Sequence, residues 1–336
     1  MKRLFAAAWL LLLCVAVQAQ EFTPPVRSFT KIDYMADSQN WAVASDGEGI
    51  VYVGNNRGLL SFDGYRWELH QLPSNQIVRS VLVQGDRIYV GSYEEFGYFQ
   101  RSVYGRMEYT SLSARLEDYD MRNDEIWRIL LHDGRIIFQA FRSWFILEPD
   151  GEVKAVRSDG FVEFFSELDG RVYASEQRLG FSLVDLDGGA LEKVPGVPFG
   201  GPCISILPGE DGGGMLVTYS EGLYSFADGR FARFRTEADA LLRTAQVNKA
   251  VRTPAGDMII GTRLSGTMCI DSAGKLLWHM SSRNVLSGNT VLDLALDARG
   301  NLWMAMGSGV AMASLGSNLP NPQSPIPYIE FISEIK

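Results

Sequence analysis

Apolar and polar residues alternate through short segments of this chain, and tight turns separate the segments. Residues 49–64, GIVYVGNNRGLLSFDG, hold two alternating runs on either side of residues 54–58, and the second run ends at Asp63-Gly64. Alternation with a period of two is typical of half-buried β-strands, and an Asp-Gly pair accepts the positive φ angles of a hairpin turn. Residues 300–315, GNLWMAMGSGVAMASL, follow the same rhythm. The pattern predicts a β-hairpin near each end of the chain.

The hairpin belongs to a repeat that occurs seven times. In each copy a turn is followed by aromatic or aliphatic residues and then, in most copies, by a small residue, at intervals of 36 to 48 residues. A period near 40 with several short strands per unit is typical of a β-propeller. The seven copies end at Gly54, Gly91, Gln139, Ser175, Thr218, Gly261 and Ala305.

Each unit is predicted to hold four strands. A leading apolar strand precedes the repeated strand, a third strand follows it (58–62 in the first unit), and the fourth ends near an aromatic residue such as Trp67 or Phe231. One unit cannot bury both of its faces, whereas units packed face to face around an axis bury one another. We therefore predict an all-β fold, a seven-bladed β-propeller of four-stranded antiparallel blades. Eight blades or an open solenoid are the alternatives.

Two segments exceed the period. Residues 102–124 lengthen the link between the second and third units, and residues 235–246 are predicted to form a short helix or turn before the sixth unit. Connections of this kind run over the surface, where binding residues are frequent.

The two ends of the chain are predicted to lie outside the propeller. Lys2 and Arg3, the apolar run 4–17 and the small-residue site ending at Ala19 indicate a secretory signal peptide over residues 1–19. We expect the propeller to span residues 20–318. Residues 319–336 are predicted to form a linker and the truncated start of a following module, because 325–332 resembles a first strand. The predicted location of the exported chain is the periplasm.

Net charge limits the kinds of partner that the chain can bind, and the cysteine count bears on whether it forms a disulfide. Without Lys2 and Arg3 the chain keeps 29 basic and 40 acidic residues, a net charge of −11. Nucleic acid and anionic membrane surfaces repel such a chain, so we expect neither contact for the mature segment. Two cysteines remain, Cys203 and Cys269, and two buried thiols are favoured over a disulfide.

The sequence favours no catalytic or metal chemistry. His70, His132 and His279 fall in three different units, whereas a metal site needs several converging ligands, so neither a metal nor another cofactor is predicted. No nucleophile motif of the Gly-x-Ser-x-Gly kind is present. A facing pair of carboxylates for glycoside hydrolysis stays open, because 40 acidic residues make some pair expected by chance.

The candidates for ligand binding lie where the leading strands begin. If these strands are innermost, their first residues surround one mouth of the central channel, where Val, Ile and Ala would suffice to seal a core. Aromatic faces stack on sugar rings, and Arg or Lys pairs with carboxylates or sulfates. A structural role, in which these residues bond to the neighbouring backbone, is an equal alternative for each. The predicted ligand-binding residues are Trp41, Arg79, Trp127, Arg128, Glu163, Asn248 and Lys249.

Three further arginines follow the repeated strands. Arg57, Arg142 and Arg263 are predicted to belong to the turns at the opposite end of the channel or to the seams between blades. A structural role is favoured for all three.

Two segments resemble a known family. Residues 300–315 resemble the two-component regulator propeller repeat, whose core is Gly-Asn-Leu-Trp-Ile-Gly-Thr and then Gly-Leu, with Ala305-Met306 replacing Gly-Thr in this copy. Residues 39–67, followed by 77–80 and 95–98, resemble the first propeller of Bacteroidetes sensor-regulators. The resemblance is specific over residues 39–98 and extends at the level of the repeat over the mature chain.

The resemblance implies a sensing function. Members of this family carry a signal peptide, two propellers, a triple-tyrosine immunoglobulin-like domain, one membrane helix and a LuxR-type helix-turn-helix or hybrid histidine kinase. This chain is then expected to be a fragment, the periplasmic ligand-sensing part of a membrane-spanning transcriptional regulator or sensor kinase. The implied ligand is a glycan or another polar small molecule, and the implied protein partners are a second propeller, the downstream domains and a second copy in a homodimer. The resemblance carries no residue-level ligand motif.

Two other functions are open from the residues alone. One is an extracellular propeller enzyme that acts on polysaccharide, as a lyase or glycosidase. The other is a scaffold for protein interaction. Converging carboxylates or a Tyr/His/Arg group in one pocket would favour the enzyme, and a flat apolar face would favour the scaffold.

Overall fold

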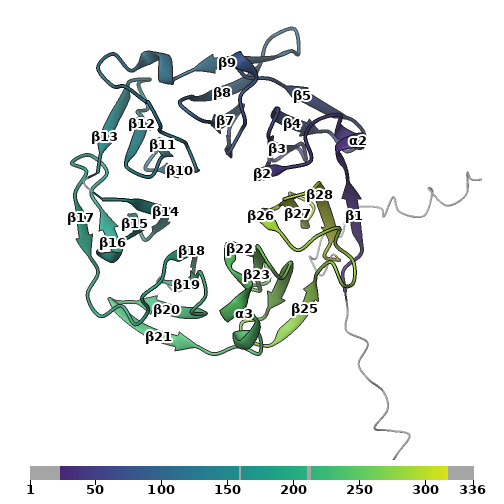
Figure 1. Ribbon diagram of the computed structural model, residues 1–336, viewed down its shortest axis with the longest axis vertical. Helices are drawn as coiled ribbons and strands as arrows, with labels where there is room; N and C mark the ends of the chain where they lie inside the picture. The colour runs from purple at the N-terminus through teal and green to yellow at the C-terminus, as the bar shows by residue number, and fades with distance from the viewer. Residues whose placement is uncertain (1–22, 159, 210–212, 317–336) are drawn as a thin grey trace, which may run out of the picture.

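Seven four-stranded antiparallel sheets surround a central axis (Figure 1). The computed structural model describes residues 23–158, 160–209 and 213–316. The predicted seven-bladed β-propeller is therefore confirmed. The predicted signal peptide (1–19) and the predicted linker (319–336) lie outside the described residues.

In blades one to six the first strand is innermost, and the next strands follow outward in chain order. Blade one consists of β2 (Asn40–Ser45), β3 (Val51–Asn55), β4 (Gly58–Phe62) and β5 (Trp67–His70). Blade two consists of β6 (Ser80–Gln84), β7 (Arg87–Gly91), β8 (Phe96–Arg101) and β9 (Met107–Ser111). Blade three consists of β10 (Arg128–His132), β11 (Arg135–Gln139), β12 (Ser143–Leu147) and β13 (Val153–Arg157). Blade four consists of β14 (Val162–Leu168), β15 (Arg171–Glu176), β16 (Gly180–Val184) and β17 (Leu191–Lys193). Blade five consists of β18 (Cys203–Pro208), β19 (Gly214–Thr218), β20 (Leu223–Ala227) and β21 (Arg230–Phe234). Blade six consists of β22 (Val247–Arg252), β23 (Met258–Thr262), β24 (Thr267–Ile270) and β25 (Leu276–Met280).

The seventh blade joins both ends of the described chain. Its inner strands are β26 (Val291–Leu296), β27 (Asn301–Met306) and β28 (Val310–Ser314), and its outermost strand is β1 (Val26–Phe29). β1 pairs antiparallel with β28, from Val26 opposite Ala313 to Phe29 opposite Val310. The ring is therefore closed by pairing between the first and the last described strands, which the repeat pattern did not reveal.

The hairpin of residues 49–64 is the middle of blade one, and every residue of β3 and β4 is buried. Gly54 is required because an added Cβ would lie 2.7 Å from the Val78 carbonyl oxygen of blade two. Gly58 has φ +134°, and a Cβ there would lie 2.4 Å from the His70 carbonyl oxygen. Both of these glycines are therefore needed because the backbone of a neighbouring strand or blade lies too close to leave room for a side chain.

The two long connections behave differently. Residues 235–246 contain helix α3 (Asp239–Ala245), as predicted. Residues 102–124 are not simply a link, because they contain β9, the outermost strand of blade two, before the short turn η2 (Ser113–Arg115). The other short elements are α2 (Lys31–Tyr34) and η1 (Pro73–Asn75).

Both cysteines are buried and unbridged, which confirms the prediction of two buried thiols. Burial raises the pKa of each thiol to about 12, so both stay protonated at neutral pH. Within the described ranges, no helix has the length and apolar character needed to cross a membrane.

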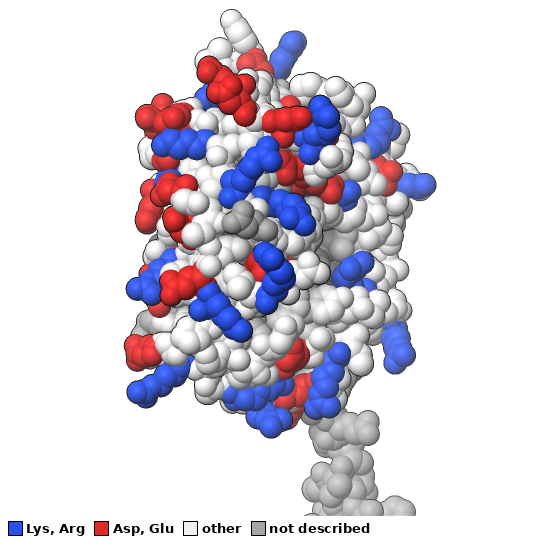
Figure 2. Space-filling view, turned by 60° about the vertical axis from the view of Figure 1, so that its left-hand side comes forward, with Lys and Arg blue, Asp and Glu red and all other residues white. Residues whose placement is uncertain are grey.

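Surface charges of both signs are interspersed over the flank that Figure 2 presents, which brings the left-hand side of Figure 1 forward. Acidic side chains recur along its left-hand edge, and basic side chains lie between them and over the centre of the view. On this flank the net negative charge of the chain is therefore not gathered into one uniform patch.

Candidate functional site

Backbone irregularities mark the beginning of most innermost strands. The pairing register shifts at Trp41 in β2, at Asn248 in β22 and at Leu292 in β26, and similar shifts occur in β14 and β18. A β-bulge of this kind leaves one residue unpaired and redirects its side chain. We use the term mouth for this end of the axis, where the innermost strands begin.

Trp41, Arg79 and Trp127 come together at the mouth from blades one, two and three. The Arg79 guanidinium carbon lies 3.7 Å from the centroid of the Trp41 ring and 4.9 Å from that of Trp127. The two indole rings meet edge to face at 6.0 Å. We call these three residues the tryptophan–arginine cluster. Cation–π contacts at such distances stabilise the arrangement by about 0.5–2 kcal/mol each.

The hydrogen bonds of the cluster leave two donors unused. Trp41 Nε1 donates to Asn56 Oδ1 at 2.7 Å, and Arg79 Nε donates to Glu125 Oε1 at 2.6 Å. Trp127 Nε1 and Arg79 Nη1 are buried and have no hydrogen-bond partner among the described residues. A buried donor without a partner costs about 1–3 kcal/mol, so these two groups would gain from an acceptor supplied by a ligand.

Aromatic rings continue from the cluster into blades three and four. The Trp127 ring lies 5.5 Å from that of Phe141, which stacks on Phe161 at 4.5 Å. Glu163 stands at the start of β14, and burial raises the pKa of its carboxyl group. No ion pair of Glu163 occurs within the described part of the chain.

On the other side of the mouth the polar residues bond to neighbouring blades. Asn248 Nδ2 donates to the Leu292 carbonyl oxygen. Lys249 Nζ lies 3.0 Å from Asp293 Oδ1, and Asp293 Oδ2 accepts a hydrogen bond from the Val43 backbone N–H at 3.0 Å. One carboxylate thus links blades six, seven and one.

Arg128 makes a similar connection between blades three, four and five. Its Nη1 donates to the carbonyl oxygens of Phe165 at 3.0 Å and Ile204 at 3.1 Å. Burial lowers the pKa of the guanidinium, and the Asp293 carboxylate acts in the opposite direction. Arg128, Asn248 and Lys249 therefore have the contacts of the structural alternative, and their role in ligand binding stays a prediction.

Of the two places predicted for Arg57, Arg142 and Arg263, the opposite end of the channel is wrong, whereas the seams between blades stay a prediction. The second strand of each blade runs antiparallel to the first, so the turn that follows it returns to the mouth. Accordingly, the Arg263 backbone N–H donates to the Gln246 carbonyl oxygen beside the start of β22. All three arginines are exposed, and none forms an ion pair with a described residue.

Three contributors to the mouth were not predicted from the sequence: Glu125, Phe141 and Phe161. The repeat alignment does place Asp293 at the mouth, in the same strand position as Lys249. Glu125 lies in the long link before β10, where the period gives no alignment.

The three histidines are far apart in the fold. His70 Nε2 lies 2.8 Å from Ser61 Oγ in the outer part of blade one, and His279 Nε2 lies 2.6 Å from the Ser265 carbonyl oxygen in blade six. His132 ends β10, away from the mouth. Among the described residues, no group of three or more His, Cys, Asp or Glu side chains is arranged to hold a metal ion.

Comparison with known proteins gives structural similarities only, because no protein-family model and no curated protein matches the chain. Two similar solved structures are extracellular domains described as belonging to hybrid two component systems of B. thetaiotaomicron. They are 17% and 15% identical, with TM-scores of 0.69 and 0.64 over 88% of this chain. A third is virginiamycin B lyase from Staphylococcus aureus, 13% identical with a TM-score of 0.68 over 88% of this chain and 100% of the lyase.

The share of the neighbour's own length that this chain covers differs between the B. thetaiotaomicron domains and the lyase. This chain spans 40% and 42% of the B. thetaiotaomicron domains, whereas it matches the lyase over its whole length. At these identities, what is shared is the propeller fold, which hosts both sensing domains and enzymes. The chain is thus a seven-bladed β-propeller that resembles extracellular domains of two component systems in fold.

Proposed function

We propose that this chain is the periplasmic, non-catalytic sensing propeller of a larger signalling protein, and that it binds a polar small molecule, such as a glycan, at the tryptophan–arginine cluster. One observation carries the proposal: Arg79 Nη1 and Trp127 Nε1 are buried donors without partners among the described residues, beside the half-buried indole rings of Trp41 and Trp127. The similarity in fold to extracellular domains of two component systems supports it.

The cluster offers the groups that sugar recognition uses. An indole face can stack on the apolar face of a sugar ring, while the two free donors bond to its oxygen atoms. Glu163 offers an acceptor for a hydroxyl group on the blade-four side of the mouth. Because Trp41, Arg79 and Trp127 belong to three blades, a ligand held by all three would stiffen the contacts between these blades.

In a full-length protein, binding would alter how the propeller packs against a second propeller and the domains beyond it. We expect this change to reach a LuxR-type helix-turn-helix or a hybrid histidine kinase through a homodimer. These partners lie outside the present chain and form part of the proposal.

A polysaccharide-directed lyase or glycosidase is the second candidate. The similarity to virginiamycin B lyase over the whole length of that enzyme favours it. Against it, the residues gathered at the mouth are tryptophan, arginine, phenylalanine and separate carboxylates, and no described histidine accompanies them. Incubation of the protein with candidate glycans, followed by analysis for cleavage products, separates the enzyme from the sensor.

A thermal-shift screen of oligosaccharides tests the binding site. At saturation one of them is expected to raise the Tm of the exported chain by at least about 3 °C. Arg79→Ala and Trp127→Ala are expected to abolish the shift. Arg263→Ala is the matched control, because Arg263 is exposed at the same end of the axis but far from the cluster. The site assignment fails if no oligosaccharide stabilises the protein, or if both cluster variants respond as the wild type does.

A further inference from the structure

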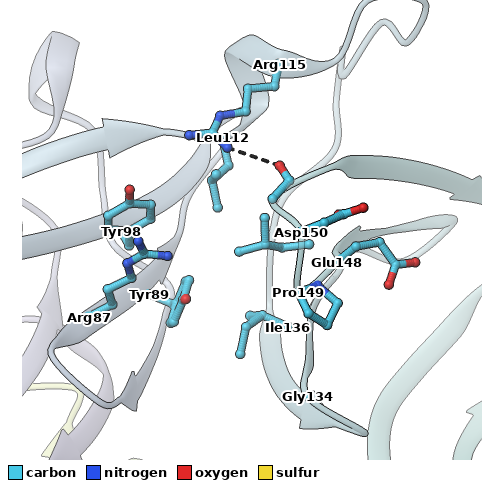
Figure 3. A pocket seen from close by; sticks show the side chains of 12 residues that line it. Arg87, Tyr89, Tyr98, Leu112, Arg115, Gly134, Ile136, Glu148, Pro149 and Asp150 are labelled. Atoms are coloured by element: carbon cyan, nitrogen blue, oxygen red, sulfur yellow. Dashed lines mark hydrogen bonds between the residues drawn. The ribbon is translucent and has the colours of Figure 1, made fainter.

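We propose that the seam between blades two and three holds a second ligand site, which binds an acidic sugar. A cleft of about 470 Å³ opens here (Figure 3). Its volume lies within the range of small-molecule sites. Blade two contributes Arg87, Tyr89 and Tyr98 to one wall, and blade three contributes Ile136 and the turn 148–151 to the other.

Two guanidinium groups project into the cleft from different elements. Arg87 lies 4.4 Å from the centroid of the Tyr98 ring, and a hydrogen bond with Tyr89 raises the pKa of its guanidinium. Arg115 comes from η2 in the long link, and its Nη1 donates to the Gly151 carbonyl oxygen at 3.2 Å across the seam. Neither arginine forms an ion pair with a described residue. Both charges are therefore positioned by neutral partners and remain available for an anion.

At the seam between blades three and four, the corresponding arginine is neutralised by carboxylates of the protein itself. Arg135 begins β11 as Arg87 begins β7, but Arg135 Nη2 forms ion pairs with Glu148, at 3.1 Å, and with Asp187 of blade four. Between blades two and three no carboxylate plays the part of Asp187. The contrast suggests that an external anion takes this place.

The carboxylates that line the cleft have other partners. Glu148 pairs with Arg135 and also lies 3.3 Å from Lys154 Nζ. Asp150 accepts a hydrogen bond from the Glu152 backbone N–H at 3.0 Å within its own turn. The charge of Glu148 is therefore compensated by Arg135 and Lys154, whereas Asp150 keeps its charge at the edge of the cleft and forms no ion pair with Arg87 or Arg115 in the described structure.

The remaining lining suits a ring with one apolar face. Leu112, Ile136 and Leu147 are buried at the base of the cleft, and Pro149 stands at its edge. Tyr89 and Tyr98 add aromatic edges and hydroxyl groups that can bond to ring hydroxyls. An apolar floor, tyrosine hydroxyls and two guanidinium groups together fit a uronic acid, whose carboxylate pairs with arginine while its ring lies on the floor.

The cleft is separate from the mouth. It lies beside the turn at Gly134, whereas Trp127 precedes the opposite end of β10. Five residues of strand separate the two ends, or about 17 Å. The proposal consequently stands or fails independently of the tryptophan–arginine cluster.

Isothermal titration calorimetry of the exported chain with digalacturonate tests the proposal, with neutral cellobiose as the uncharged comparison. We expect a binding event with digalacturonate and none of equal affinity with cellobiose. Arg87→Gln and Arg115→Glu should each weaken the binding at least about tenfold, because each removes a charge-assisted hydrogen bond. Arg115 is exposed, so its variant keeps the test informative if Arg87→Gln impairs folding.

Arg171→Gln is the matched control. Arg171 begins β15 as Arg87 begins β7 and lines a cleft between blades four and five. The other charged residues of that cleft are one lysine and three carboxylates: Lys193, Asp169, Glu192 and Asp228. The control and Trp127→Ala should bind digalacturonate as the wild type does. The proposal is overturned if the wild type does not bind digalacturonate, if Arg87→Gln and Arg115→Glu bind normally, or if either control weakens binding equally.

Discussion

The two sides of the mouth use similar residues in opposite ways. In blades six and seven, Asn248, Lys249 and Asp293 are bonded to neighbouring strands. In blades one to three, Arg79 and Trp127 keep buried donors without a partner in the described structure. A polar residue at the start of an innermost strand is therefore no sign of a ligand site by itself. What distinguishes the two sides is whether the polar atoms are already satisfied.

The difference follows from where the ring closes. Blade seven contains the first and last described strands, and Asp293 ties its innermost strand to blades six and one. Polar contacts there add to the strand pairing of β1 with β28. In blades one to three the contacts at the mouth are only partly of this kind. Arg79 pairs with Glu125, and Arg128 bonds to blades four and five, whereas Arg79 Nη1 and Trp127 Nε1 keep no partner among the described residues.

Asp293→Ala is expected to have the largest effect on stability. It leaves the Lys249 ammonium and the Val43 backbone N–H without their partner, and losing one member of a mostly buried pair costs about 3 kcal/mol. The midpoint of urea unfolding should fall clearly. Lys249→Met should cost less, because Asp293 would keep its bond to Val43 N–H. Equal, small effects of both variants would show that this side of the mouth does not support ring closure.

Arg79→Met should cost less stability than Asp293→Ala and should also weaken ligand binding. The variant loses two cation–π contacts and leaves the Glu125 carboxylate without its partner, but it also removes the unpartnered Nη1, which offsets part of the loss. We expect a loss of about 2 kcal/mol in urea unfolding. If Arg79→Met destabilises the protein as much as Asp293→Ala does, the cluster is a structural contact and the contrast between the two sides disappears.

The fold was predictable because it repeats. The hairpin at residues 49–64 returns near residues 300–315 with the same alternation, since equivalent blades bury equivalent faces. The closure by β1 was not predictable in this way. Strand β1 has only four residues, 26–29. Its pairing with residues 310–313 depends on the first and last blades being adjacent in the ring, which no local sequence pattern encodes.

The candidate site was predictable in position but not in detail. Counting back from the repeated strands identified Trp41, Arg79 and Trp127, which the structure brings together. The partners of these residues come from turns and from the long link, as Asn56 and Glu125 illustrate, and such segments carry no period. Which donors remain without a partner depends on side-chain geometry and is visible only in the fold.

Glu163→Gln should give the smallest effect, in the stabilising direction at neutral pH. Burial raises the pKa of the Glu163 carboxyl in the folded state, so between its unfolded and folded pKa values the folded protein binds more protons than the unfolded chain. Stability attributable to this group therefore falls as pH rises through that window and stays lower at neutral pH.

The neutral amide removes this penalty, and we expect a rise in Tm on the order of 1 °C at pH 7 that vanishes near pH 3.5. Thermal melts of the wild type and the variant across this pH range measure the difference, with Glu108→Gln as the control, because Glu108 is exposed on the outermost strand β9. A variant that is less stable at pH 7 would mean that the ionised Glu163 makes a favourable contact. In that case Glu163 would resemble Asp293, whose carboxylate is already bonded to neighbouring blades.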